Sequence, residues 1–118
     1  MNHSICLMKD VMKAFNDFEK DLLQLHALSL NEAMVLCLLG DHAGSALSAS
    51  EIAEKTGFSA SHTSKVLRSA ESHKWISRSL CTKDRRKMHF ELTEEGKKKL
   101  RQLKSAPIEV PELFKVLL

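Results

Sequence analysis

The feature that most constrains the fold of this chain is a pair of short helical segments joined by a tight turn. Ser48 and Glu51 have the S-x-x-E spacing of a capping box, in which each side chain binds one free backbone N–H at a helix start. Gly57 suits the left-handed residue that ends this helix, and Ser59 is typical of the N-cap of the next helix, expected over about 60–73. Two short helices joined in this way predict a helix-turn-helix.

The apolar pattern changes from a helical period to a strand period just after these two helices. Residues 75–81 alternate with a period of two, with Ile76 and Leu80 on one predicted face, and residues 88–92 alternate in the same way. The connection between them, residues 82–87, is strongly charged, so the two strands predict a hairpin with a basic tip. The predicted fold class is therefore mainly α with a small β-hairpin wing, a winged helix-turn-helix.

Further helices are predicted on both sides of this unit. A heptad pattern of apolar residues predicts a helix over about 5–26, and Ser29 with Glu32 repeats the capping-box spacing ahead of the apolar run 33–39. Another helix is predicted to begin at Thr93. The first helix carries more apolar surface than one stripe, so it either covers its own domain alone or also contributes to a dimer interface.

Positive charge is concentrated in the middle of the chain. Residues 59–87 contain eight Lys or Arg and two acidic residues, a net charge of +6, whereas the whole chain carries +3. A basic segment of this kind is expected where a chain contacts a phosphate backbone, and the alternative is a solvated basic face without a partner. Small and hydroxylated side chains in the second helix can approach base edges, and its cations can reach guanine or phosphate. The predicted DNA-facing residues of this helix are Ser59, Ala60, Ser61, His62, Ser64, Lys65 and Arg68.

These residues form part of an ordered series of motifs. Residues 47–67 read Leu-Ser-x-x-Glu-Ile-Ala-Glu-Lys-x-Gly-Phe-Ser-x-Ser-x-x-Ser-Lys-x-Leu. The later motifs are Trp75-Ile76-x-Arg78, Asp84-x-Arg86, Phe90-x-Leu92-Thr93 and Gly96. Over about residues 28–104 the series resembles the helix-turn-helix and wing of the MarR family of transcriptional regulators, with the wing as its most specific part. Lys74 stands where that family commonly has glycine.

The resemblance implies that the wing contacts DNA through its arginines, with Arg86 at the family's D-x-R position. Asp84 is expected to orient the wing through a salt bridge, because a carboxylate would repel phosphate. The alternative is that Asp84 and Arg86 form a surface ion pair of little energetic value. The predicted DNA-contacting residues of the wing are Lys83, Arg85, Arg86 and Lys87.

The expected function is that of a transcriptional regulator that binds double-stranded DNA as a homodimer, with a small-molecule effector implied by the resemblance. The chain is expected to form a single domain over 1–118, with a DNA-binding lobe over about 29–104 and dimer contacts from about 5–26 and 107–118. Family members usually dimerise through a long C-terminal helix, and only a short apolar segment follows Pro107 here. The alternative function is a winged-helix protein-interaction or assembly module without sequence-specific DNA binding.

The cysteines and the N-terminal residues favour a cytoplasmic location. Cys6, Cys37 and Cys81 are odd in number and widely spaced, as expected of reduced thiols. Cys37 is predicted to lie in the core and Cys81 in a strand. Cys6 invites comparison with peroxide-sensing regulators, but tyrosines support the thiolate in that branch and this chain contains none. No apolar run is long enough for a membrane span, and no secretory signal is expected.

The remaining polar residues do not form a predicted catalytic or metal site. The six histidines lack the i, i+4 spacing and the cysteine partners that zinc sites use. Asp and Glu residues are scattered along the predicted helices, and the chain has no Gly-rich phosphate loop or nucleophile elbow. Neither an enzyme activity nor a cofactor or metal is therefore expected.

Overall fold

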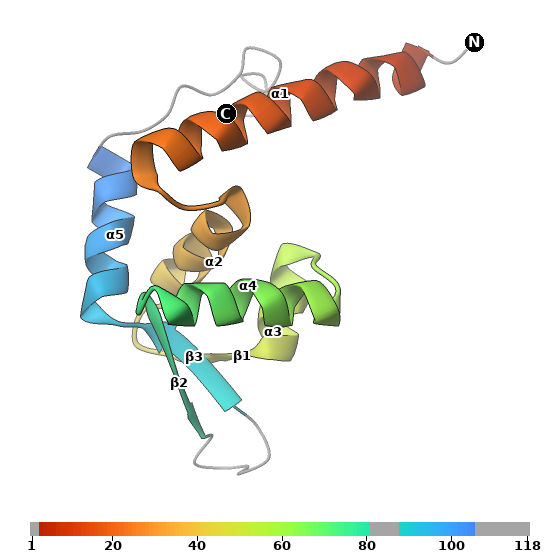
Figure 1. The fold of residues 1–118 in the computed structure, drawn as a ribbon. Coiled ribbons are helices and arrows are strands. Elements are labelled where there is room, and N and C mark those ends of the chain that lie inside the picture. The colour runs from red at the N-terminus through yellow and green to blue at the C-terminus, as the bar shows by residue number, and fades with distance from the viewer. Residues whose placement is uncertain (1–2, 81–87, 106–118) are drawn as a thin grey trace. The chain divides into compact units, whose positions relative to one another are not determined.

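The computed structural model of this chain describes residues 3–80 and 88–105. In these ranges it is mainly helical with a small sheet (Figure 1), which confirms the predicted fold class. The elements, in chain order, are α1 (His3–His26), α2 (Leu30–Asp41), β1 (Leu47–Ser48), α3 (Ala49–Thr56), α4 (Ala60–Ser72), β2 (Ile76–Leu80), β3 (Met88–Leu92) and α5 (Glu94–Ser105). Residues Asn31–Ser105 form one compact unit, and α1 belongs to another.

The helix α1 confirms the predicted first helix and shows apolar side chains on its surface. Ile5, Met8 and Met12 are all more than half exposed. The helix ends at Ala27, which has a left-handed backbone conformation (φ 58°) and donates its N–H to the carbonyl of Leu23 at 2.9 Å. Among the described residues no single helix is long and apolar enough to cross a membrane, and α1 with α2 meets that criterion only as a bent pair.

The sheet in the unit Asn31–Ser105 is antiparallel, with the strand order β1-β3-β2. The strands β2 and β3 are the predicted hairpin, and Ile76 pairs with Leu92 and Arg78 with Phe90. The sequence pattern did not predict β1, a two-residue strand that places Leu47 opposite Phe90. The buried core of this unit includes Val35, Leu36, Leu47, Ile52, Leu67, Ala70, Ile76 and Phe90.

The helix-turn-helix is built by the local signals that the sequence carries. The Ser48 side chain accepts a hydrogen bond from the Glu51 N–H, and the Glu51 carboxylate accepts one from the Ser48 N–H at 3.1 Å, which completes the capping box of α3. Gly57 ends α3 in the left-handed region (φ 81°) and Ser59 caps α4. Thr56 links the end of α3 to the turn, because its hydroxyl donates to the Ile52 carbonyl at 2.7 Å and accepts from the Phe58 N–H at 3.3 Å.

The junction between the hairpin and α5 depends on a close backbone approach. The N–H of Thr93 donates to the carbonyl of Trp75 at 3.0 Å, and the Thr93 hydroxyl donates to the carbonyl of Lys74 at 2.6 Å. A Cβ on Gly96 would lie only 1.9 Å from the Trp75 carbonyl oxygen, so glycine is required there. Lys74 adopts a left-handed conformation (φ 64°), which explains why glycine suits that position in the family it resembles.

The prediction that Cys37 lies in the core is wrong, because its side chain is exposed. The run 33–39 is apolar throughout, and an α-helix must still present some of its positions outward. Met34 and Cys37 take those positions, whereas Val35, Leu36 and Leu39 are buried. Cys81 lies outside the described residues.

Candidate nucleic-acid interface

The helix α4 buries one face and exposes the opposite one. Thr63, Val66, Leu67 and Ala70 are buried, as their spacing predicts. Ser61, Lys65 and Arg68, spaced i, i+4 and i+7, form a stripe on the exposed face. Of the residues predicted to face DNA, the exposed ones are Ser59, Ala60, Ser61, Ser64, Lys65 and Arg68. We call these six residues the outer face of α4.

His62 is the predicted residue that the structure places apart from this face. Its ring is half-buried, and its Nε2 lies 3.0 Å from the side-chain amide nitrogen of Asn31 on α2. The Phe58 ring meets it edge to face with 4.7 Å between the ring centres. His62 therefore fixes the first turn of α4 against α2 and against the preceding turn.

A second polar contact between α2 and α4 lies nearer the end of α4. The buried carboxylate of Glu32 accepts a hydrogen bond from the Ser69 hydroxyl at 3.0 Å. Its Oε2 also lies 3.7 Å from Nε2 of His73, whose ring stacks on Trp75. The capping-box spacing identified Glu32 only as a helix-start residue, and these contacts across to α4 were not predicted.

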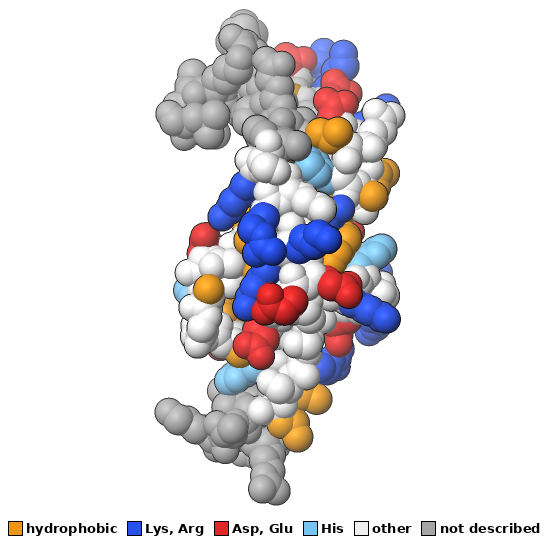
Figure 2. All heavy atoms as spheres, turned by 90° about the vertical axis from the view of Figure 1, so that its left-hand side faces the viewer, with side chains coloured by type: hydrophobic (Ala, Val, Ile, Leu, Met, Phe, Trp, Pro, Cys, Tyr) orange, Lys and Arg blue, Asp and Glu red, His pale blue; other side chains and the backbone are white. Residues whose placement is uncertain are grey.

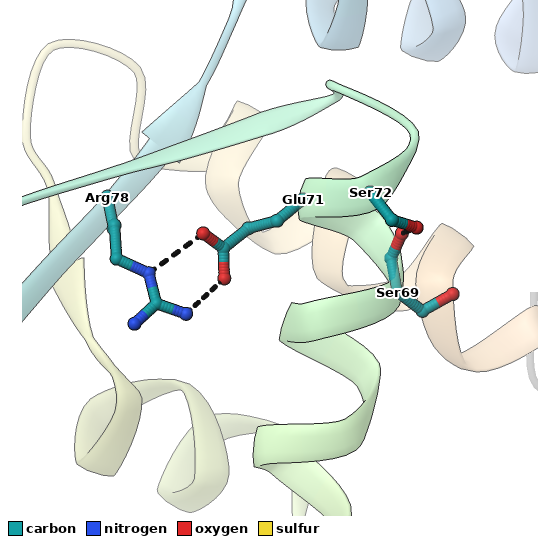
Figure 3. Close-up of polar contacts among 4 residues, drawn as sticks. All are labelled: Ser69, Glu71, Ser72 and Arg78. Carbon is teal, nitrogen blue, oxygen red and sulfur yellow. Dashed lines mark hydrogen bonds and ion pairs between the residues drawn. The ribbon is translucent and has the colours of Figure 1, made fainter.

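An ion pair joins the last turn of α4 to the hairpin (Figure 3). Arg78 on β2 donates from Nε to Oε2 of Glu71 at 2.8 Å and from Nη2 to Oε1 of the same carboxylate. The guanidinium lies over the Phe90 ring, 5.4 Å from its centre. The hydrogen bond to Glu71 holds the pKa of Arg78 above its ordinary value. Arg78 was predicted as a strand residue and as part of the Trp75-Ile76-x-Arg78 motif, but it was not among the predicted DNA-contacting residues. Its pairing with Glu71 was not predicted.

A groove of about 440 Å³ lies beside this ion pair, between the start of α3, the middle of α4 and the two hairpin strands. Two arginines and several hydroxyl groups line it, and Phe90 contributes apolar surface. The polar lining residues are Ser48, Ser50, Ser64, Arg68 and Arg78, and no acidic residue lines the groove among those the structure describes. Arg68 belongs both to this groove and to the outer face of α4.

The helix α5 provides a contrast in charge distribution. Figure 2 shows the side of the molecule on which α5 lies, where Lys and Arg side chains gather beside acidic ones. The acidic residues of the first turn of α5 are Glu94 and Glu95, and Lys97 lies 3.3 Å from Glu94. Both acidic residues lie in the first turn, and the five cations of α5 follow Gly96, so this helix carries a net charge of +3.

The remaining predictions concern residues outside α4 and the groove. The predicted wing contacts Lys83, Arg85, Arg86 and Lys87, with Asp84, lie outside the described residues. Within the described ranges, no group of three His, Cys, Asp or Glu is placed to hold a metal ion. Although the Cys37 side chain is exposed, neighbouring atoms exclude part of the solvent around its thiol, and this desolvation raises the pKa of the thiol. Lys104 opposes the effect and Asp41 adds to it.

A family model, a curated relative and several solved structures match this chain. A model of the MarR family matches residues 26–87. The uncharacterized HTH-type transcriptional regulator YfiV of Bacillus subtilis is 40% identical over 76 residues, which are 64% of this chain and 46% of that protein. The chain thus spans less than half the length of this curated relative.

Solved structures show the same fold. The Staphylococcus aureus MepR–DNA complex superimposes with a TM-score of 0.83 at 21% identity, covering 100% of this chain and 85% of that one. A cysteine-to-serine mutant of MarR from E. coli gives a TM-score of 0.73 at 17% identity, covering 89% and 75% of the two chains. YusO from B. subtilis gives 0.69 at 25% identity, covering 86% and 70%.

Proposed function

Because this chain belongs to the MarR family, we propose that it is a transcriptional regulator that binds duplex DNA through α4 and the hairpin. The observation that carries the proposal is the outer face of α4. It combines small and hydroxylated side chains with Lys65 and Arg68, and it lies opposite a fully packed face. Such a helix can enter the major groove without steric hindrance from bulky residues.

The surroundings of α4 suit this role because they fix the helix in position. Asn31 and Glu32 hold one flank of the helix near its two ends, and Arg78 holds the other flank through Glu71. A recognition surface held by such contacts loses little conformational freedom on binding. The proposed wing contacts are Lys83, Arg85, Arg86 and Lys87, with Asp84 orienting the wing.

We further propose that the protein binds as a homodimer on a two-fold symmetric site. The exposed apolar residues of α1 support this, because solvent-facing side chains such as Ile5 and Met12 are costly to leave uncovered. In this proposal α1 and residues 107–118 supply the dimer contacts, and the DNA-binding lobe spans about 29–104. A symmetric pair of α4 helices would then meet two half-sites.

Membership in the MarR family also supports a regulator rather than an enzyme, a cytoplasmic location, and a response to a small-molecule effector. The effector is tested by adding candidate compounds to a preformed protein–DNA complex. Release of labelled DNA at constant ionic strength is the expected result, and no release by any compound would remove this part of the proposal.

Salt dependence tests the proposed DNA binding. Affinity for a labelled duplex, measured by fluorescence anisotropy, is expected to fall steeply with salt. Replacing both Arg85 and Arg86 by Ala should reduce the slope of log K against log [salt] by about 0.9 per lost phosphate contact. The double variant Lys98→Ala, Arg101→Ala removes the same charge from α5 and should leave the slope unchanged. A wild-type protein that retains no duplex even at low salt would instead favour a protein-interaction or assembly module.

A further inference from the structure

We propose that the groove between α3, α4 and the hairpin binds one phosphate of the DNA backbone, with Arg68 and Arg78 as its ligands. This inference rests on the proposed DNA binding and adds to it a specific backbone contact, shared between Arg68 on the outer face of α4 and Arg78 on β2. It also gives a function to Arg78, whose position in a strand does not by itself indicate one.

The chemistry of the groove matches a phosphodiester. Two guanidinium groups line it, and Arg is the side chain whose planar fork fits two phosphate oxygens at once. The hydroxyls of Ser48, Ser50 and Ser64 add donors of the kind that contact phosphate and sugar in protein–DNA complexes. Among the described residues no carboxylate lines the groove to repel an anion.

Arg78 is already held in one orientation. Glu71 receives hydrogen bonds from Nε and Nη2 of Arg78, and Figure 3 shows the other terminal nitrogen, Nη1, turned away from that carboxylate. The guanidinium also lies over the face of the Phe90 ring. A long side chain fixed in this way loses less entropy when it binds an anion, so Glu71 acts as a positioning residue. Because Glu71 also offsets the charge of Arg78, Arg68 supplies the net positive charge of the groove.

The position of the groove favours DNA over a free anion. Arg68 belongs both to the groove and to the outer face of α4, so a duplex lying along that face would pass over the groove. The hairpin strands form the opposite wall. A phosphate between these two walls would fix the spacing of the recognition helix and the wing on one stretch of backbone.

Methylphosphonate substitution tests this contact directly. Single uncharged methylphosphonates are introduced in turn along each strand of a bound duplex, and affinity is measured for the full-length wild type and for Arg78→Gln, with folding of each variant checked by circular dichroism. At one position the methylphosphonate is expected to weaken DNA binding by the wild type about tenfold. Arg78→Gln should bind the unmodified duplex about tenfold more weakly than the wild type, and the same methylphosphonate should not weaken its binding further. The exposed variant Lys98→Gln should keep the full sensitivity of the wild type.

Two further measurements are needed. One separates the planar guanidinium of Arg78 from its charge, and the other distinguishes a phosphate of DNA from a free anion. Arg78→Lys keeps the charge without the fork, so it should retain the wild-type salt slope but lose most of the methylphosphonate effect. Inorganic phosphate should displace DNA no better than chloride at equal ionic strength, and specific displacement would identify a small-anion site and overturn the inference. The inference would also be overturned if every methylphosphonate weakened DNA binding by Arg78→Gln by the same factor as it weakens binding by the wild type. A wild type that binds no duplex would overturn the proposed function as well.

Discussion

Replacing Gly96 with alanine tests the close approach between α5 and the hairpin. The added Cβ would lie 1.9 Å from the Trp75 carbonyl oxygen and 3.2 Å from Cδ2 of Leu92. The Trp75 carbonyl oxygen is a backbone atom, so the contact can be relieved only if α5 moves away from the segment that leads into β2. That movement would lengthen the hydrogen bond from the Thr93 N–H to the same carbonyl, now 3.0 Å.

The expected magnitude follows from three contributions. Overpacking costs about 1–3 kcal/mol, and a weakened hydrogen bond adds about 1 kcal/mol. The higher helix propensity of alanine offsets roughly 1 kcal/mol of this. We therefore expect Gly96→Ala to lower the free energy of unfolding by about 2 kcal/mol and the melting temperature by about 8 °C.

Urea and thermal unfolding followed by circular dichroism measure this effect, with Lys98→Ala as the control. Lys98 is exposed on the same helix, so its replacement should change the free energy of unfolding by less than about 0.5 kcal/mol. Helix propensity alone predicts that Gly96→Ala is more stable than the wild type. A variant at least as stable as the wild type would therefore refute the backbone contact.

Three other predictions concern single positions. Lys74→Gly should raise the free energy of unfolding by about 0.5–1 kcal/mol, because glycine adopts the left-handed conformation of this position without strain. A Lys74→Ala variant as stable as Lys74→Gly would contradict this. Ser48→Ala should cost about 1 kcal/mol in urea unfolding through loss of the α3 cap, whereas the exposed neighbour Ser50→Ala should cost much less; equal losses would argue against the cap. The Cys37 thiol, studied in a variant with the other two cysteines replaced by serine, should react slowly with iodoacetamide at pH 7 and faster as pH rises beyond the pKa of an ordinary thiol, because its own pKa is raised. The same pH–rate profile in the unfolded protein would contradict this.

The parts of the fold that were predicted are those coded by neighbouring residues. The Ser48 capping box, the Gly57 helix end and the alternation of β3 each depend on residues within a few positions of one another. The strand β1 was missed because two residues are too few to show a period, and its partner Phe90 lies 43 positions after Leu47. The exposure of Cys37 was missed because an unbroken apolar run does not show which side of a helix faces outward.

The candidate interface divides in the same way. Helical spacing was enough to place Lys65 and Arg68 on an exposed face, because the buried positions between them mark the opposite side. The contact of His62 with Asn31 joins two residues that are 31 positions apart in the chain, and no local pattern indicates it. The pairing of Arg78 with Glu71 depends on how the hairpin packs against α4, so the arginine could be recognised as part of a groove only from the structure.

The most direct test of the proposed regulator is selection of bound fragments from genomic DNA by the full-length protein. The expected result is enrichment of a two-fold symmetric sequence whose half-sites lie one helical turn, about 10 bp, or a multiple of it apart. A variant carrying Lys65→Gln and Arg68→Gln on the outer face of α4 should lose this enrichment. Recovery of no sequence by the wild type, or of the same sequences by the wild type and this variant, would contradict DNA recognition by α4.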